Sequence, residues 1–176
     1  GLAAPLLKPL ASQLVGVDLS GAMLEKAHER MLYDELVIGE LCAFMTSRPA
    51  AFDLIVLADT LVYFGALDEV FKTARGSLVP GGMIAFAIES RTLDDGGPAF
   101  RLEPHGRYTH RCDYIAEALI TSGYTLGSKE SIVIRRELNA DVRGLAVAAH
   151  NTPPPGDVGS TTDQCISGRN PSDSPE

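Results

Sequence analysis

The feature that most constrains the fold is an apolar run that ends in an acidic residue and leads directly into a helix. Residues 14–19 read Leu-Val-Gly-Val-Asp-Leu, and residues 21–32 place apolar side chains along one helical face. An apolar run without polar alternation is typical of a strand covered on both faces, as in a parallel sheet. Ligands of such sheets bind beyond the carboxyl ends of the strands, which makes Asp18 the first candidate binding residue.

Two further apolar runs repeat this arrangement. Residues 52–58 are followed by Asp59, and residues 83–88 are followed by Glu89. The turn Pro80-Gly81-Gly82 comes directly before the second of these runs. Because the carboxyl ends of parallel strands meet at one edge of a sheet, we expect the acidic residues to lie along the same edge.

The full pattern alternates helices with strands and closes with two strands in succession. We expect helices at 2–12, 21–32, 41–46, 67–78 and 111–122, and strands at 14–19, 35–39, 52–58, 83–88, 128–137 and 142–149. The short link between the last two strands predicts an antiparallel hairpin. The pattern therefore predicts an α/β fold: a Rossmann-like, mostly parallel sheet with helices on both faces and a C-terminal antiparallel hairpin.

Length and composition predict one domain with a tail. The 176 residues, of which 45% are hydrophobic, suffice for a single core, which we place at 1–150. Residues 151–176 contain five prolines and few large apolar side chains, so this segment is predicted to be a disordered tail. No internal repeat is evident.

Charge and cysteine usage exclude several classes of function. The net charge is −8 and there is no cluster of lysine and arginine, which argues against a nucleic-acid partner. No apolar run approaches the roughly 20 residues needed to cross a bilayer, and no signal peptide is evident, so we predict a soluble cytoplasmic protein without a membrane partner. Cys42, Cys112 and Cys165 form no CxxC pair, so neither a disulfide framework nor a metal site is expected. The oligomeric state is not predicted.

The order of these motifs resembles that of the class I S-adenosylmethionine-dependent methyltransferases. The segment 15–20 is similar to the second strand of that family, residues 52–59 to the fourth, and residues 78–82 to the turn before the fifth. A closer similarity is to bacterial methyltransferases that occur downstream of tetratricopeptide repeats. Those proteins share the Leu-Val-Tyr segment at 61–63 and the Gly-Arg-Tyr-x-His segment at 106–110. The resemblance covers roughly residues 1–149.

The resemblance implies S-adenosyl-L-methionine as the cofactor and assigns residues to it. It implies that Asp18 binds the ribose hydroxyls, that Leu19 and Met23 flank the adenine, and that Asp59 lies near the methionine end. It implies that Glu40 lies near the adenine amino group. The cofactor-binding candidates are Gly1, Asp18, Leu19, Met23, Glu40, Leu41 and Asp59, and the substrate-binding candidates are Tyr63, Tyr108 and His110.

The implied reaction is methyl transfer to a small molecule or to an exposed protein side chain. Displacement at a sulfonium methyl group is in line, so the protein mainly has to orient the acceptor. A general base is needed only when the acceptor must lose a proton. No catalytic residue stands out for this reason, and the candidate bases are His110 and Asp59.

Two alternatives remain open at the level of sequence. Gly1 stands where the family has the last glycine of its glycine-rich loop, so the resemblance predicts that the first strand is missing from this chain and that cofactor binding is weak. A non-catalytic domain that keeps the fold is therefore the second hypothesis. The third is a Rossmann-type NAD-dependent oxidoreductase, which shares the acidic residue at the strand end.

Overall fold

A computed structural model describes residues 1–91, 97–137 and 140–152. Its helices are α1 Ala4–Leu7, η1 Lys8–Leu10, α2 Gly21–His28, α3 Leu41–Thr46, η2 Leu61–Tyr63, α4 Asp68–Ser77 and α5 Cys112–Thr121, where η denotes a 3-10 helix. Its strands are β1 Val15–Asp18, β2 Glu35–Ile38, β3 Phe52–Leu57, β4 Leu78–Arg91, β5 Phe100–Leu102, β6 Tyr108–Arg111, β7 Tyr124–Glu137 and β8 Ala140–Asn151. No helix within these ranges is long and apolar enough to cross a membrane.

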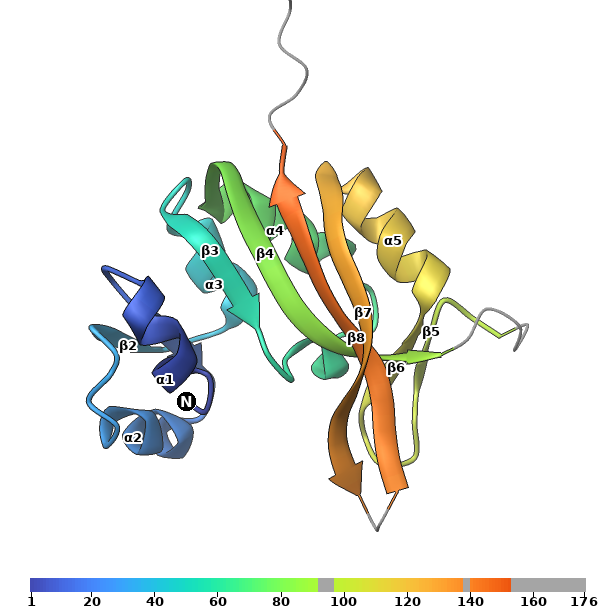
Figure 1. The fold of residues 1–176 in the computed structure, drawn as a ribbon, viewed down its shortest axis with the longest axis horizontal. Coiled ribbons are helices and arrows are strands. Elements are labelled where there is room, and N and C mark those ends of the chain that lie inside the picture. The colour runs from blue at the N-terminus through green and yellow to red at the C-terminus, as the bar shows by residue number, and fades with distance from the viewer. Residues whose placement is uncertain (92–96, 138–139, 153–176) are drawn as a thin grey trace, which may run out of the picture.

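The strands of the described residues form two sheets (Figure 1). β1 and β2 pair in parallel as a small sheet of their own. In the larger sheet β3 pairs in parallel with β4, and the order β5-β6-β4-β8-β7 continues from β4. Within these ranges no backbone ladder joins β1 to β3, so the two sheets are linked through helices and side chains. The α/β class is confirmed, and the larger sheet is mixed because β8 runs antiparallel to β4.

β4 lies at the centre of the larger sheet, and its two faces carry different side chains. Ile84, Phe86 and Ile88 are buried, whereas Ala85 and Ala87 alternate with them and are only half-buried. The Phe86 ring packs 5.4 Å from the ring of Phe71 in α4, which is fully buried. The core therefore lies between the face of the sheet that bears the large side chains and the helices that cover it.

Helices α3 and α4 lie behind the sheet in Figure 1, and α5, beside β7, adds Ile115, Ala118 and Leu119 to the same core. The opposite face, toward the viewer, bears no helix from the described part of the chain, and a depression of about 370 Å³ lies on it. Its floor consists of small side chains, among them Ala85, Ala87, Ala146 and Ala148. The remaining α-helices, α1 and α2, accompany the small sheet, which is not hydrogen-bonded to the larger one.

The C-terminal antiparallel hairpin is confirmed and is longer than predicted. β7 and β8 pair from Tyr124 opposite Asn151 to Glu137 opposite Ala140, and the distal half extends past the other strands. Asn151 is buried, and its amide donates to the carbonyl oxygens of Leu78 at 3.3 Å and Val79 at 3.0 Å. The hairpin thus reaches one residue past the domain boundary that we placed at 150. The predicted tail lies outside the described residues from 153 onward.

Three local features differ from the predictions. The region 2–12 forms only the short helices α1 and η1, since the prolines at 5 and 9 limit the hydrogen bonds that a long helix needs. Residues 79–82 form a bulge inside β4, where Gly81 has a φ of 80° and the register with β3 shifts. The hairpin of β5 and β6 was not predicted, because its strands carry charged and aromatic side chains without a clear alternation.

Candidate functional site

Asp18 ends β1 and opens the turn into α2. Its Oδ1 accepts the backbone N–H of Ser20 at 2.8 Å, and the Ser20 side chain in turn accepts the N–H of Met23 as the helix cap. The Asp18 side chain is exposed, and beside it Leu19 is 74% and Met23 is 53% exposed. An exposed carboxylate next to two exposed apolar side chains is an unusual surface, and it offers acceptors for hydroxyl groups together with a face for a flat ring.

Glu40 follows β2 and caps α3. Its Oε2 accepts the N–H of Ala43 at 2.7 Å, and the backbone N–H groups of Cys42 and Ala43 hold the pKa of this carboxyl below its usual range. Burial, with Glu40 and Glu69 nearby, raises the pKa of the Cys42 thiol to about 11, so the thiol stays protonated at neutral pH. Glu40 therefore has a structural role as a cap, and its exposed position leaves the carboxylate accessible to a ligand. Leu41 is half-buried at the start of α3.

Asp59 lies just past β3 and has a φ of 52°, in the left-handed region that residues other than glycine rarely adopt. Its side chain is 48% exposed, and its Oδ1 lies 3.5 Å from Nη1 of Arg135. The chain then turns into η2, where Tyr63 is 62% exposed. Asp59 and Tyr63 thus lie close together in the chain beyond the carboxyl end of β3, separated by the fully buried Leu61 and Val62.

Glu89 and Arg135 complete this edge of the larger sheet. Arg135 of β7 forms an ion pair with Glu89 near the end of β4, and the Glu89 side chain is only 4% exposed. The sequence analysis placed Glu89 at the edge but missed Arg135, which is 46 residues away in the chain. Only a predicted pairing of β7 alongside β8 and β4 could have found it.

The structure buries His110, the second candidate base, among aromatic side chains. The ring is fully buried, Nε2 lies 2.9 Å from the carbonyl oxygen of Gly65, and the ring stacks on Tyr114 at 6.2 Å with an interplanar angle of 10°. Burial lowers its pKa, so the ring is neutral at physiological pH. Tyr108 is half-buried and packs edge-on against Phe100 at 6.1 Å.

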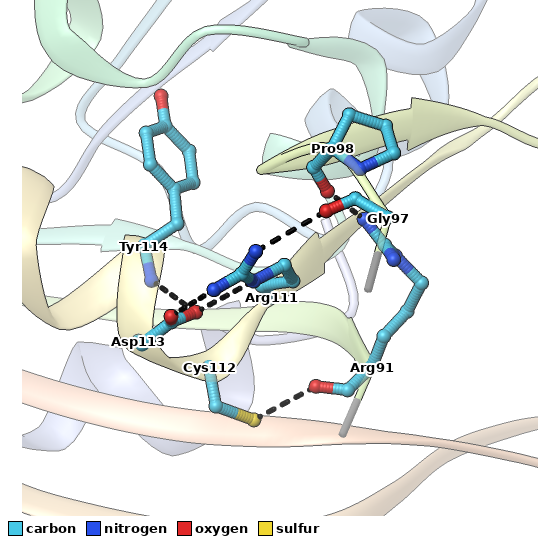
Figure 2. A network of polar contacts seen from close by, with 7 residues as sticks. All are labelled: Arg91, Gly97, Pro98, Arg111, Cys112, Asp113 and Tyr114. Atoms are coloured by element: carbon cyan, nitrogen blue, oxygen red, sulfur yellow. Dashed lines mark hydrogen bonds and ion pairs between the residues drawn. The ribbon is translucent and has the colours of Figure 1, made fainter. Parts of the chain in front are cut away.

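Two arginines hold the chain where β5 begins, as Figure 2 shows. Arg111 donates to the carbonyl oxygen of Gly97 at 3.2 Å and pairs with Asp113, while Arg91 donates to the carbonyl oxygen of Pro98. The Sγ of Cys112 lies 3.2 Å from the carbonyl oxygen of Arg91. These contacts fix the small β5-β6 hairpin to the end of β4, which brings the aromatic cluster of Phe100, Tyr108, His110 and Tyr114 beside Gly65.

The structure divides the candidate residues between its two sheets. Gly1, Asp18, Leu19, Met23, Glu40 and Leu41 belong to the part of the chain around β1 and β2, with Gly1 against Ala27 of α2. Asp59, Tyr63, Glu89 and Arg135 lie at the carboxyl ends of β3 and β4. No group of three or more His, Cys, Asp or Glu side chains placed to hold a metal occurs within the described ranges.

The residues at β1 fit the adenosine part of S-adenosylmethionine. The observation that supports the fit is the exposed Asp18 carboxylate, which the Ser20 N–H holds through one oxygen, beside the exposed Leu19 and Met23. A carboxylate suits two ribose hydroxyls, and apolar side chains suit an adenine face. Acidic groups also suit a ligand that carries a sulfonium and an ammonium group.

The described residues form an α/β protein with candidate residues at several strand ends, and comparisons with known proteins identify the fold more closely. Residues 1–84 match a protein family described as a methyltransferase domain. Over 77 residues the chain is 29% identical to trans-aconitate 2-methyltransferase from Paracidovorax citrulli, a match that covers 44% of this chain and 30% of that protein. The match therefore spans less than a third of that relative's length.

Solved structures share the fold over most of the chain. A SAM-dependent methyltransferase from Methanosarcina mazei superposes with a TM-score of 0.65 at 13% identity, over 85% of this chain and 86% of the other. The 1,6-didemethyltoxoflavin-N1-methyltransferase from Burkholderia thailandensis, solved with its substrate and S-adenosylhomocysteine bound, has a TM-score of 0.63 at 16% identity, over 80% of this chain and 62% of the other. The chain therefore has the Rossmann-like fold of SAM-dependent methyltransferases.

Proposed function

We propose that this chain is the S-adenosylmethionine-dependent methyltransferase domain of its protein and transfers a methyl group to a small molecule. The observation that carries the proposal is the position of Asp18, Glu40 and Asp59, each at or just beyond the carboxyl end of a different parallel strand and all inside the segment that matches the methyltransferase-domain family. The fold shared with a methyltransferase that binds S-adenosylhomocysteine supports the same cofactor. The similarity to an enzyme named for trans-aconitate supports a small-molecule acceptor.

The proposed cofactor supplies a methyl group on a positively charged sulfur, and the residues of this chain hold the reactants. Asp18 binds the ribose, with Leu19 and Met23 against the adenine and Glu40 near its amino group. Gly1 and Leu41 remain proposed contacts on the same side. Asp59 and Tyr63 lie at the other end of the edge, where they contact the methionine part and the acceptor. Orientation of the acceptor is the main contribution, since a well-placed nucleophile gains several kcal/mol from proximity alone.

Asp59 is the proposed base when the acceptor must lose a proton. It is half-exposed at a strand end, whereas His110 is buried and has its Nε2 on a backbone carbonyl. An acceptor that needs no deprotonation would use the same carboxylate for orientation only.

Calorimetric titration with S-adenosylmethionine, S-adenosylhomocysteine and NAD tests this proposal. We expect measurable binding of the first two and none of NAD. A preference for NAD would instead support a dinucleotide-dependent oxidoreductase. Sequence similarity to the methyltransferases that follow tetratricopeptide repeats supports the further proposal that the chain belongs to that subgroup.

A second candidate is a domain that keeps the fold without the reaction. The observation that favours it is the division of the site between two sheets that share no backbone ladder in the described ranges. This candidate predicts no heat of binding with any of the three ligands while the chain gives a cooperative unfolding transition. Binding of S-adenosylhomocysteine at micromolar affinity would count against this candidate, and methyl transfer would exclude it.

A further inference from the structure

An ion-pair cluster links three elements that are far apart in the sequence. Arg135 of β7 pairs with Glu89 of β4, and Nη1 of the same guanidinium lies 3.5 Å from Oδ1 of Asp59, just past β3. β8 lies between β4 and β7 in the sheet, so the Arg135 side chain reaches across one strand to meet Glu89. Exposure of the side chains rises from 4% at Glu89 through 16% at Arg135 to 48% at Asp59. The guanidinium is therefore held between an inner and an outer carboxylate.

The inner pair fixes where the guanidinium lies. A buried carboxylate without a counter-ion is costly, so Glu89 holds Arg135 in place, and the two charges depend on each other. Arg136, the next residue of β7, shows the contrast. Its side chain is 80% exposed and pairs with Asp141 across the hairpin, away from the strand ends. Of these two adjacent arginines, only Arg135 faces the candidate site.

The outer contact lies on a strained segment of backbone. Asp59 has a φ of 52°, and a residue with a Cβ costs on the order of 1 kcal/mol in this region. Such conformations persist where surrounding groups fix them. Asp59 also begins the turn that leads past the buried Leu61 and Val62 to the exposed Tyr63, so its conformation sets the direction in which the chain enters η2.

We propose that Arg135 is the positioning residue for segment 58–63: Glu89 anchors the guanidinium, and the guanidinium holds Asp59 in its left-handed conformation at the strand end. The proposal rests on the proposed function for its significance, because Asp59 and Tyr63 are the residues assigned there to the methionine part and the acceptor. Because Arg135 belongs to β7, the proposal gives the terminal hairpin a role in positioning the site. The same geometry makes Arg135 act through Asp59 and not on the ligand directly.

Hydrogen–deuterium exchange of the full chain tests the proposal without relying on methyl transfer. In Arg135→Ala we expect amides of segment 58–63 to exchange up to about fivefold faster, the scale of one lost ion pair with a half-exposed partner. Arg136→Ala is the matched control and should leave this segment unchanged. Arg135→Lys should restore part of the protection, because it keeps a positive charge between the two carboxylates. Unchanged exchange of the segment in Arg135→Ala would overturn the proposal.

Two further measurements separate positioning from general loosening. If Arg135→Ala accelerates exchange equally in α4 and α5, the arginine stabilises the whole domain and the proposal is wrong. If that variant does not fold, Glu89→Gln and Arg135→Lys test the same point, and both should loosen segment 58–63 selectively. Titration with S-adenosylhomocysteine then distinguishes this proposal from the proposed function. Absence of binding in the unmodified chain would refute the function and leave the exchange result standing.

Discussion

Replacement of Asp18 is the sharpest test of the cofactor site, because the structure separates its two oxygens by role. Oδ1 accepts the Ser20 N–H at 2.8 Å and helps to start α2, and because the residue is exposed the second oxygen is available to a ligand. Asp18→Asn keeps an oxygen for Ser20 but replaces the charged acceptor with a neutral amide. A hydrogen bond to a charged group contributes about 1.5–3 kcal/mol, so S-adenosylhomocysteine should bind roughly 10- to 100-fold more weakly.

Isothermal titration calorimetry of the two variants and one control measures this effect. Asp18→Ala should weaken binding at least as much as Asp18→Asn and should also lower stability, since the contact with Ser20 is lost. Asp53→Asn is the control, because Asp53 is an exposed carboxylate within β3 and not at its carboxyl end. Equal affinities for Asp18→Asn and the unmodified chain would refute the ribose assignment and leave Asp18 as a residue that only supports the helix start.

Three further predictions concern stability. The lowered pKa of His110 means that the unfolded chain binds a proton that the buried ring does not, so the free energy of unfolding should hold above about pH 6.5 and fall below it. Urea unfolding as a function of pH should show a weaker pH dependence in His110→Phe. His105→Gln, at an exposed site, should keep the pH dependence of the unmodified chain. Asn151→Ala removes the amide that donates to the carbonyl oxygens of Leu78 and Val79. Chemical denaturation should show a free energy of unfolding lower by about 1–3 kcal/mol. An unchanged free energy of unfolding would mean that water replaces the amide. Gly144→Ala places a Cβ 2.2 Å from the Ile88 carbonyl oxygen. The substitution should lower the free energy of unfolding by about 1–3 kcal/mol and the melting temperature by several degrees. An unchanged melting temperature would contradict the close approach of β4 and β8.

The strands that carry Asp18 and Asp59 could be predicted because both signals are local. In each case an uninterrupted apolar run is followed by an acidic residue and then by a helical pattern. β1, β3 and the helices after them match these signals. The fold class followed from the order of such units. The bulge at 79–82 lies outside this reasoning, since it depends on the register between β3 and β4 and not on the glycines alone.

The residues that sequence reasoning missed or misassigned depend on contacts between distant segments. Arg135 acquires its place only when β7 is laid beside β8 and β4, and a basic residue in a polar strand carries no sign of this. His110 looked like an accessible base because it stands in a basic, polar stretch. The β5-β6 hairpin turns it inward, where Gly65, 45 residues earlier, meets its Nε2. The sequence holds no local signal for that inversion.

The separation of the two sheets gives a bound ligand a mechanical role. Asp18 and Glu40 move with β1 and β2, whereas Asp59 and Arg135 move with the larger sheet, and no backbone ladder within the described residues makes the two move together. A molecule that contacts both groups would act as a brace between them, and part of its binding free energy would go into fixing their relative placement. Its presence should raise the melting temperature, because a ligand that binds only the folded chain stabilises it.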